Sequence, residues 1–443
     1  MKLRLTVLIL VFGTFCNFNP LCAEEKEKLI TICQGIQMVL KDNRLIKVTL
    51  PDNEMAYQDS LLSRSALLPN LNVSAIKTYN RFQSQMKFGS AEIAVSNKDP
   101  FSFGVDVYQT LFDFGKSLSY YRASNELWKA TKAHTESVKR VATLEFIVAY
   151  FDLLEAQKMI DVAQTEVESL TSYLDDIGHL YDQGVVVKND LLPAQVKLAD
   201  AKQKLIAATN DREVTAARLN NILALSLRDK IAVQDIKMQV PILPEIEDAW
   251  KQAQEQRPEV TFYADQIKAS FSRERAKAVE NFPVIYADGG FTYNQNKYQV
   301  HEDNTSVNLG AKMDLYDGGA ARAELFKERS RQNQLKEQKN KLIEDIKFEI
   351  EDSFFGVKNA NEKVAVARDA LNQADENVRF YRVKYNAGSA TSTDVLEAIA
   401  LQTRAQTNYF SADYELKRDY AKLIYSMGAD LASTYERIEK ETK

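Results

Sequence analysis

Residues 101–116 read FSFGVDVYQTLFDFGK, and this stretch decides the architecture of the chain. From Phe101 to Val107, apolar side chains occupy the odd positions, whereas the even positions carry serine, glycine and aspartate. This alternation is typical of a strand with one apolar and one polar face. Beyond Gly115 no glycine or proline occurs before Gly178, so the sequence predicts a very long helix directly after the strand. At a rise of about 1.5 Å per residue, that helix would span about 93 Å.

The same arrangement occurs twice in the chain, at a constant offset of 204 residues. The offset holds without insertion for more than a hundred residues, which indicates a tandem duplication. The matched pairs are LFDFG (111–115) with LYDGG (315–319), YDQG (181–184) with YNAG (385–388), and DLL (190–192) with DVL (394–396). Upstream, LPN (68–70) corresponds to FPV (282–284) at an offset of 214, so the segment between the two anchors is ten residues shorter in the second copy.

Four segments of about ten residues share the alternating pattern, at 71–81, 101–111, 284–294 and 305–315. This is the length of a tilted strand through an outer membrane. The polar connections at 83–98 and 296–304 are expected to face the medium, because bacterial barrels keep their long loops outside. Four strands cannot close a barrel, and lipid does not tolerate open sheet edges, so the subunit is expected to share a barrel with copies of itself. Three copies would supply 12 strands, an even number within the observed range.

Each strand pair is followed by a long helix, a short break and a returning helix. Apolar positions of the long helices recur at spacings of four and three, which indicates packing of helix on helix. Pro193 is expected in the first turn of its returning helix, where no backbone bond is lost. The sequence therefore predicts a mainly α protein with a small transmembrane β portion, in which long helical hairpins form a periplasmic α-barrel. The predicted long helices are 116–177 and 320–387, and the returning helices are 190–225 and 394–426.

The N-terminus has the layout of a cleavable export signal, with Lys2 and Arg4 before an apolar run and then Leu21-Cys22-Ala23. Cleavage would leave Cys33 as the only thiol, so no disulfide is possible within the mature chain. Cleavage would also take the formal net charge from −5 to −7, which gives no support to a nucleic-acid partner. After the signal, no apolar run approaches the roughly 18 to 20 residues of a membrane-spanning helix.

Five segments are expected along the chain. The segment between the repeats is less regular than the rest, and we expect it to pack with the tail as a belt around the middle of the helices. The predicted segments are the signal peptide (1–23), the first structural repeat (24–226), the inter-repeat equatorial segment (227–257), the second structural repeat (258–428) and the C-terminal equatorial tail (429–443).

In this order and spacing, the motifs resemble the TolC family of outer membrane efflux proteins over essentially all of the mature chain. The residues that carry the resemblance are LPNL at 68–71, the duplicated motif at 111–115 and 315–319, and the tip pattern Tyr385-x-x-Gly388-x5-Asp394. The resemblance implies a homotrimer in outer-membrane lipid, with a shared barrel of 12 strands and a large periplasmic helical tunnel. It also implies docking to a periplasmic adaptor protein that connects to an inner-membrane transporter.

The two tips, at the turns farthest from the strands, are the candidate contact sites for the adaptor. In the similar family these hairpins meet the adaptor, and the residues at the matching positions here are Tyr181, Gly184, Asp190, Tyr385 and Gly388. Local physical chemistry also gives these turns a plainer role. Each glycine is expected to end a helix in the left-handed conformation, and Asp190 and Asp394 are expected to cap the next helices.

Asp394 and Glu397 are the candidate periplasmic gate. Three positions apart at a helix start, they resemble a capping box, in which acids only satisfy backbone donors. In the similar family, the matching positions form an acidic ring at the narrow entrance, where three subunits would bring six carboxylates together and favour cations. The first repeat has Pro193 in place of Glu397, so the second repeat alone would build the ring. Ala390 stands where the family often has a basic residue, which leaves open how the entrance is held closed.

The sequence indicates no catalytic site. The histidines are scattered, the single mature cysteine forms no metal-ligand cluster, and no phosphate-binding glycine loop or nucleophile elbow is present. We therefore expect no enzymatic activity, no metal and no cofactor. The alternative to a passive duct is a periplasmic coiled-coil scaffold or adaptor without channel activity, motivated by the same long helices. The sequence does not distinguish drugs, a secreted polypeptide or metal ions as cargo.

Overall fold

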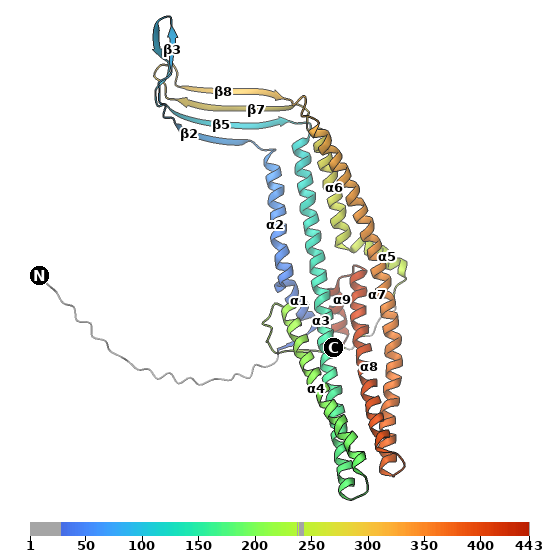
Figure 1. Ribbon diagram of the computed structural model, residues 1–443. Coiled ribbons are helices and arrows are strands. Elements are labelled where there is room, and N and C mark those ends of the chain that lie inside the picture. The colour runs from blue at the N-terminus through green and yellow to red at the C-terminus, as the bar shows by residue number, and fades with distance from the viewer. Residues whose placement is uncertain (1–27, 237, 239–242, 443) are drawn as a thin grey trace, which may run out of the picture.

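The structure, a computed structural model, describes residues 28–236, 238 and 243–442. The predicted export signal at 1–23 lies outside these residues. Figure 1 shows an elongated chain in which long helices run side by side, with a β-sheet at one end and two helical hairpins at the other. None of the helices in the described ranges combines the length and the apolar character needed to cross a membrane.

Four antiparallel strands form one open sheet in the order β2-β5-β7-β8. They are β2 (Asn70–Lys77), β5 (Phe101–Phe112), β7 (Val284–Asn294) and β8 (Asp303–Lys312). The predicted pairing of the four segments into one sheet is confirmed, and each repeat contributes two strands. β2 ends four residues earlier than predicted. Beyond its end, the side-chain amide of Asn80 donates to the Lys98 carbonyl at 2.9 Å. A side-chain hydrogen bond therefore takes the place of strand pairing at this position.

The connection between β2 and β5 contains a small hairpin where the sequence predicts only a polar loop. Strands β3 (Gln85–Phe88) and β4 (Ala91–Ala94) pair antiparallel around a turn in which Gly89 has a φ of 61°. Met86 and Ile93 lie opposite each other on one face of this hairpin. The connection predicted as a polar loop at 83–98 therefore contains two short strands that the sequence reading did not predict.

The two long helices have the same length, as a duplication requires. α3 (Lys116–Asp182) and α7 (Ala320–Asn386) each contain 67 residues, which corresponds to about 100 Å. α3 continues through Gly178 and ends beyond the predicted residue 177. Both helices run from the sheet to the tips, so each repeat spans the full length of the molecule (Figure 1).

The returning helices are also equal in length. α4 (Lys188–Ile222) and α8 (Ser392–Ser426) each contain 35 residues and pack on α3 and α7, respectively. Pro193 is the sixth residue of α4 and does not lie in its first turn. The helix therefore gives up one backbone hydrogen bond at this position, and the expectation that no bond is lost is wrong.

The duplicated motif before each long helix is a helix cap. The Asp113 carboxylate accepts hydrogen bonds from the backbone N–H of Gly115 at 3.1 Å and of Ser117 at 2.7 Å. Asp317 accepts bonds from the two corresponding positions at 2.9 and 2.7 Å. Gly115 and Gly319 have φ angles of 82° and 88°, a left-handed conformation that glycine adopts without strain. The motif thus turns the chain from strand to helix in both repeats.

Shorter helices cover the half of the molecule between the middle and the sheet. α2 (Arg44–Ser65) packs on α3, and α6 (Pro258–Ala278) packs against both α3 and α7. α6 therefore bridges the two repeats on the strand side. No returning helix reaches this half, so α2 and α6 complete the layer of helices there (Figure 1).

A second set of short elements surrounds the middle of the molecule. These elements are β1 (Lys28–Ile30), α1 (Ile32–Asp42), β6 (Ile231–Val233), α5 (Ile246–Gln256) and α9 (Leu431–Thr442). β1 pairs parallel with β6, α1 packs on α3 and α9, and α5 packs on α7. The fully buried Tyr150 connects α3 to these elements, because its hydroxyl donates to the Gln234 carbonyl just after β6 at 2.7 Å.

Candidate functional site

The two tips are tight turns that join each long helix to its returning helix (Figure 1). Gly184 and Gly388 have φ angles of 75° and 71°. After each glycine the chain bonds back into the helix, from the Val185 N–H to the Leu180 carbonyl in one tip and from the Ser389 N–H in the other, both at 2.9 Å. The left-handed helix ends predicted from the two glycines are found in both repeats.

The returning helix of the second tip is capped by Thr391 and not by Asp394. The Thr391 N–H and hydroxyl both donate to Asp394 Oδ2 at 2.7 Å, and the Asp394 N–H donates to Thr391 Oγ1 at 3.3 Å. The predicted capping pair of Asp394 with Glu397 is therefore wrong, because the helix begins about one turn earlier than expected. Hydrogen bonds from Thr391 lower the pKa of Asp394, which keeps this carboxylate charged at neutral pH.

Asp190 occupies the equivalent place in the first tip. The Val187 N–H donates to Asp190 Oδ2 at 3.4 Å, and Val187 is the residue that precedes α4. The prediction that Asp190 and Asp394 are the cap residues is thus corrected in the same way for both tips. Each aspartate is the third residue of its helix and satisfies the backbone donor just before the helix.

The two tips also contact each other. The Tyr173 hydroxyl on α3 donates to the Ser392 carbonyl at 3.2 Å, and the Ser392 hydroxyl donates to the Asp190 carbonyl at 3.3 Å. The rings of Tyr173 and Tyr385 meet edge-on, with centroids 5.5 Å apart. Burial raises the pKa of both phenols, so they stay neutral. Apolar side chains from all four helices are buried beside this contact: Leu170, Ile177, Ala194, Leu198, Val378, Val395 and Ile399.

The remaining predicted site residues lie on the surface of the tips. Tyr181 is 40% exposed, and both tip glycines are exposed. Glu397 is exposed one turn beyond Asp394 on α8, and no side chain in the described part of the chain bonds to its carboxylate. The structure thus brings Asp190 and Tyr385 together through Tyr173 and Ser392, and it leaves Glu397 facing outward. Among the described residues, no group of three or more possible metal ligands is placed to hold an ion.

Sequence reasoning missed Tyr173, Thr391 and Ser392. The cap could have been found, because Thr391-Ser-Thr-Asp394 has the spacing of a capping box. The contact between Tyr173 and Ser392 joins residues 219 positions apart, and the local sequence around either residue does not predict it.

The sheet has one apolar and one polar face. Side chains lie in register in rows across the four strands. Two rows on the apolar face are Leu71, Val107, Gly289 and Val307, and Val73, Val105, Phe291 and Thr305. A row on the polar face is Asn72, Asp106, Gly290 and Ser306. On the apolar face Val307 is 85% exposed and Leu309 is 74% exposed. A strand-length apolar surface of this kind suits a sheet that borders lipid on one side and water on the other.

Aromatic side chains mark both ends of the sheet. At the helix end, Phe112 contacts Phe114 with ring centroids 4.8 Å apart, and Phe114 contacts Phe282 at 5.1 Å. At the loop end, Tyr79 and Phe82 are exposed. Aromatic rings at both boundaries of an apolar band are typical of proteins that span an outer membrane.

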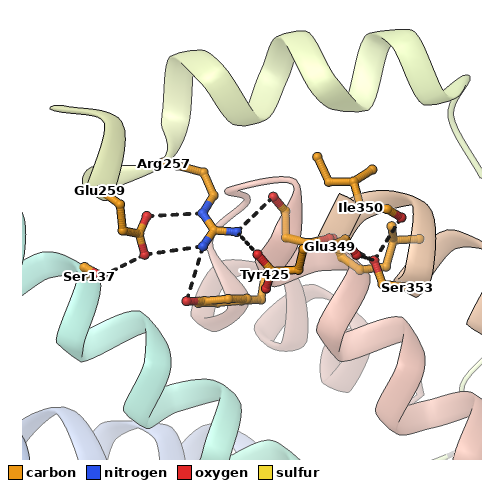
Figure 2. A network of polar contacts seen from close by, with 9 residues as sticks. Ser137, Arg257, Glu259, Glu349, Ile350, Ser353 and Tyr425 are labelled. Atoms are coloured by element: carbon orange, nitrogen blue, oxygen red, sulfur yellow. Dashed lines mark hydrogen bonds and ion pairs between the residues drawn. The ribbon is translucent and has the colours of Figure 1, made fainter. Parts of the chain in front are cut away.

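A buried guanidinium joins several elements at the middle of the molecule (Figure 2). Arg257 lies between α5 and α6 and is 5% exposed. Its nitrogens donate to Glu259 at 3.1 Å and to Glu349 of α7 at 2.6 Å. They also reach the Tyr425 hydroxyl and the Ser426 carbonyl of α8, both at 3.4 Å. One residue of the inter-repeat segment therefore contacts both the long helix α7 and the returning helix α8 of the second repeat.

Contacts from α3 complete this junction. The Ser137 hydroxyl donates to Glu259 at 2.7 Å, and the Arg140 guanidinium donates to the Gly428 carbonyl at 2.7 Å. A Cβ atom at Gly428 would lie 3.2 Å from Arg257 Cγ and from its backbone nitrogen, so at this glycine the chain passes close to the backbone and the side-chain stem of Arg257. The junction thus holds α3 of the first repeat against the second repeat.

The charges of the junction support one another. Burial opposes ionisation of Glu259, but hydrogen bonds and attraction from Arg257 outweigh it and lower the pKa of this carboxyl. Burial also raises the pKa of Tyr425 to about 12, so the phenol stays neutral. Sequence reasoning missed this cluster, because Glu349 and Tyr425 lie 92 and 168 positions from Arg257.

The chain matches a protein family described as outer membrane efflux protein over residues 35–225 and 249–429. The outer membrane protein TolC of Vibrio cholerae is 22% identical to it over 413 residues, which cover 87% of this chain and 88% of the relative. The alkaline protease secretion protein AprF of Pseudomonas aeruginosa is 20% identical, with 94% and 88% covered. Among solved structures, the CmeC outer membrane channel of Campylobacter jejuni superposes with a TM-score of 0.79 at 16% identity, covering 93% of this chain and 89% of that chain.

Proposed function

The chain belongs to the outer membrane efflux protein family, and from this premise we propose that it is the passive exit duct of a tripartite efflux or type I secretion system. The observation that carries the proposal is the four-stranded sheet, with an apolar face, a polar face and two unpaired edges. A coiled-coil scaffold without channel activity has no use for such a sheet, and the relatives include a secretion protein and a channel.

Closure of the sheet by copies of the chain follows from strand direction. β2 runs away from the helices and β8 runs back toward them, so β2 of one copy and β8 of the next stand antiparallel. Every pair around the ring then has the same antiparallel arrangement, and no edge is left open to lipid. Three copies give a barrel of 12 strands, with apolar side chains toward lipid and polar side chains toward the lumen.

The helices extend the same wall into the periplasm. Within one subunit α3 packs with α4 and α8, and α8 packs with α7, so α4 and α7 are the outer members of the set. Both carry exposed apolar side chains that a neighbouring copy would cover, since α4 of one subunit then lies beside α7 of the next. These side chains are Val196, Ile206 and Val214 on α4, with Phe348, Phe355 and Val383 on α7.

The tips form the periplasmic entrance of this duct. Asp394 and Glu397 from three subunits supply a ring of carboxylates that favours cations, and the charge on Asp394 is supported by its lowered pKa. Tyr181, Gly184, Asp190, Tyr385 and Gly388 form the surface that docks the periplasmic adaptor, which in turn connects the duct to the inner-membrane transporter. The contact of Tyr173 with Ser392 holds the two tips of a subunit together, in place of a basic residue at Ala390.

Single-channel recording in planar bilayers tests the proposal. Protein purified in detergent is first shown by light scattering to have the mass of three copies, and it is then added to one side of the bilayer. Discrete, uniform openings are expected. A protein that is trimeric and inserts but never opens, even after the tip contact is removed by Tyr173→Phe, would overturn the duct in favour of a scaffold.

A further inference from the structure

The polar face of the sheet carries a compact group of two carboxylates and two phenols at the middle of the strands. Asp106 and Tyr108 lie on β5, and Tyr286 and Asp288 lie on the neighbouring β7. Tyr108 is directly opposite Asp288, and Asp106 is opposite Gly290. All four residues have the parity of the polar face, so in the proposed duct they line the lumen at mid-depth of the membrane. The inference therefore rests on the proposed function.

The two phenol rings are stacked across the strands. The ring centroids of Tyr108 and Tyr286 are 5.3 Å apart and their planes differ by 30°. Tyr286 in turn leans over Gly310 of β8, because a Cβ atom at Gly310 would lie 2.5 Å from Tyr286 Cζ. The glycine is thus what allows the ring to lie across the next strand. Tyr108 remains 41% exposed, so in the proposed duct part of its ring is accessible from the lumen.

The absence of a side chain at Gly290 leaves room for the Asp106 carboxylate. A Cβ atom at Gly290 would lie 2.7 Å from Asp106 Oδ1, so the carboxylate covers this glycine. No hydrogen bond or ion pair reaches Asp106 from any residue that the structure describes. Asp288 accepts one hydrogen bond, from Asn308 Nδ2 at 2.9 Å. Both carboxylates keep unused acceptor positions toward the lumen.

The charge of this face is unbalanced. Over the four described strands of the sheet, the polar face carries these two carboxylates and a single basic residue, Lys312, at the helix end of β8. Three subunits would therefore place six carboxylates around the middle of the lumen. Charge of one sign in a narrow lumen with low-dielectric walls concentrates counter-ions strongly.

We propose that Asp106, Tyr108, Tyr286 and Asp288 form a cation-selecting band inside the barrel, with transient affinity for organic cations that join a charged amine to an aromatic group. The carboxylates attract the charge, and the exposed ring of Tyr108 stacks on the aromatic group or takes the ammonium over its face. The band acts independently of the acids at the periplasmic entrance. Each contact is weak, as conduction requires, because a solute that is held firmly would block the duct.

Ion selectivity and block of single channels test the two parts of this proposal separately. The carboxylate part is tested by Asp106→Asn with Asp288→Asn, measured as the reversal potential in a KCl gradient. The double variant is expected to lower the ratio of K⁺ to Cl⁻ permeability severalfold, because six carboxylates become neutral amides of the same shape. Lys312→Gln is the opposing variant, and it should raise the same ratio.

The aromatic part is tested by Tyr108→Leu with benzyltrimethylammonium as the probe. A cation–π contact at an exposed site contributes about 0.5–1 kcal/mol, so the half-blocking concentration should rise about two- to fivefold. The K⁺ to Cl⁻ ratio should stay as in the unmodified channel, because no charge is changed. Benzyl alcohol, which has the ring without the charge, should give no block that depends on Asp106.

The outcomes separate this inference from the proposed duct. A protein that never opens in the bilayer removes the duct and the band together. Channels that open normally but keep their selectivity in the double aspartate variant and in Lys312→Gln overturn the band alone. An unchanged half-blocking concentration in Tyr108→Leu overturns the assignment of organic cations.

Discussion

Replacing Arg257 by alanine tests whether the junction in Figure 2 holds the two repeats together. Breaking a buried ion pair from one side costs about 3–5 kcal/mol, because the remaining charge is left without compensation. Here the Glu349 side chain is 42% exposed, so water recovers part of its loss. Glu259 is 18% exposed and keeps the hydrogen bond from the Ser137 hydroxyl. The expected loss is therefore at the lower end of that range, about 3 kcal/mol.

Urea unfolding of the detergent-solubilised protein, followed by circular dichroism at the helix band, measures this loss. Lys341→Ala is the matched control, because Lys341 pairs with Asp345 on the same helix α7 while both side chains are more than half exposed. The control should lose less than about 0.5 kcal/mol. Arg257→Met with Glu259→Met should lie within about 1 kcal/mol of the parent, since apolar side chains of similar volume replace the pair. If Arg257→Ala is no less stable than Lys341→Ala, the assignment of the junction is refuted.

The same junction predicts sensitivity to acid. The pKa of Glu259 in the folded protein lies below its ordinary value of 4.5, so the group binds protons more readily in the unfolded chain. Its contribution to stability is therefore present above pH 4.5 and is lost as the pH falls through the folded-state pKa. The double methionine variant should lack this part of the acid dependence. Parallel stability curves below pH 4.5 would show that the pair contributes nothing.

Four further variants test other parts of the structure. Asp394→Asn with Glu397→Gln should reduce cation preference and block by divalent cations in bilayer recordings, and unchanged ion selectivity would remove the gate assignment. Tyr173→Phe removes the hydrogen bond between the tips and should raise the fraction of time that the channel is open; an unchanged open fraction would mean that other contacts hold the tips. Asp113→Ala and Asp317→Ala each remove a helix cap and should cost about 1 kcal/mol in urea unfolding, with similar values at the two repeats. Values that differ strongly would show that the two motifs do not play equivalent roles.

The strands and long helices could be predicted because their patterns have a simple physical origin. Each strand has one apolar and one polar face, so apolar and polar residues alternate along residues 101–111 and 305–315. The long helices could be predicted from the near absence of glycine and proline. The constant offset shows which segments of the two repeats correspond. The end of β2 could not be predicted, because side-chain hydrogen bonds such as that of Asn80 take the place of the backbone hydrogen bonds between strands there.

The contacts between distant segments could not be predicted. The cap at Thr391 is an exception, because it is a local pattern, but it was predicted about one turn too late, at Asp394. The hairpin of β3 and β4 has only four residues in each strand, too few for a pattern to stand out. Arg257 shows a different limit, because its role depends on partners in α7 and α8 that only the folded chain brings together.

Disulfide cross-linking between neighbouring sheet edges tests the central claim most directly. In a Cys33→Ser background, one cysteine replaces Val73 in β2 and a second is placed in turn at positions 305, 307, 309 and 311 of β8, all on the apolar face. Within one chain β2 and β8 are separated by two strands, so a bond between them can form only across a subunit boundary. If the sheet closes between copies, at least one position gives a covalent trimer on a non-reducing denaturing gel after oxidation in outer membranes. If every position leaves the chain monomeric on that gel while light scattering shows a trimer, the strands do not close a shared barrel.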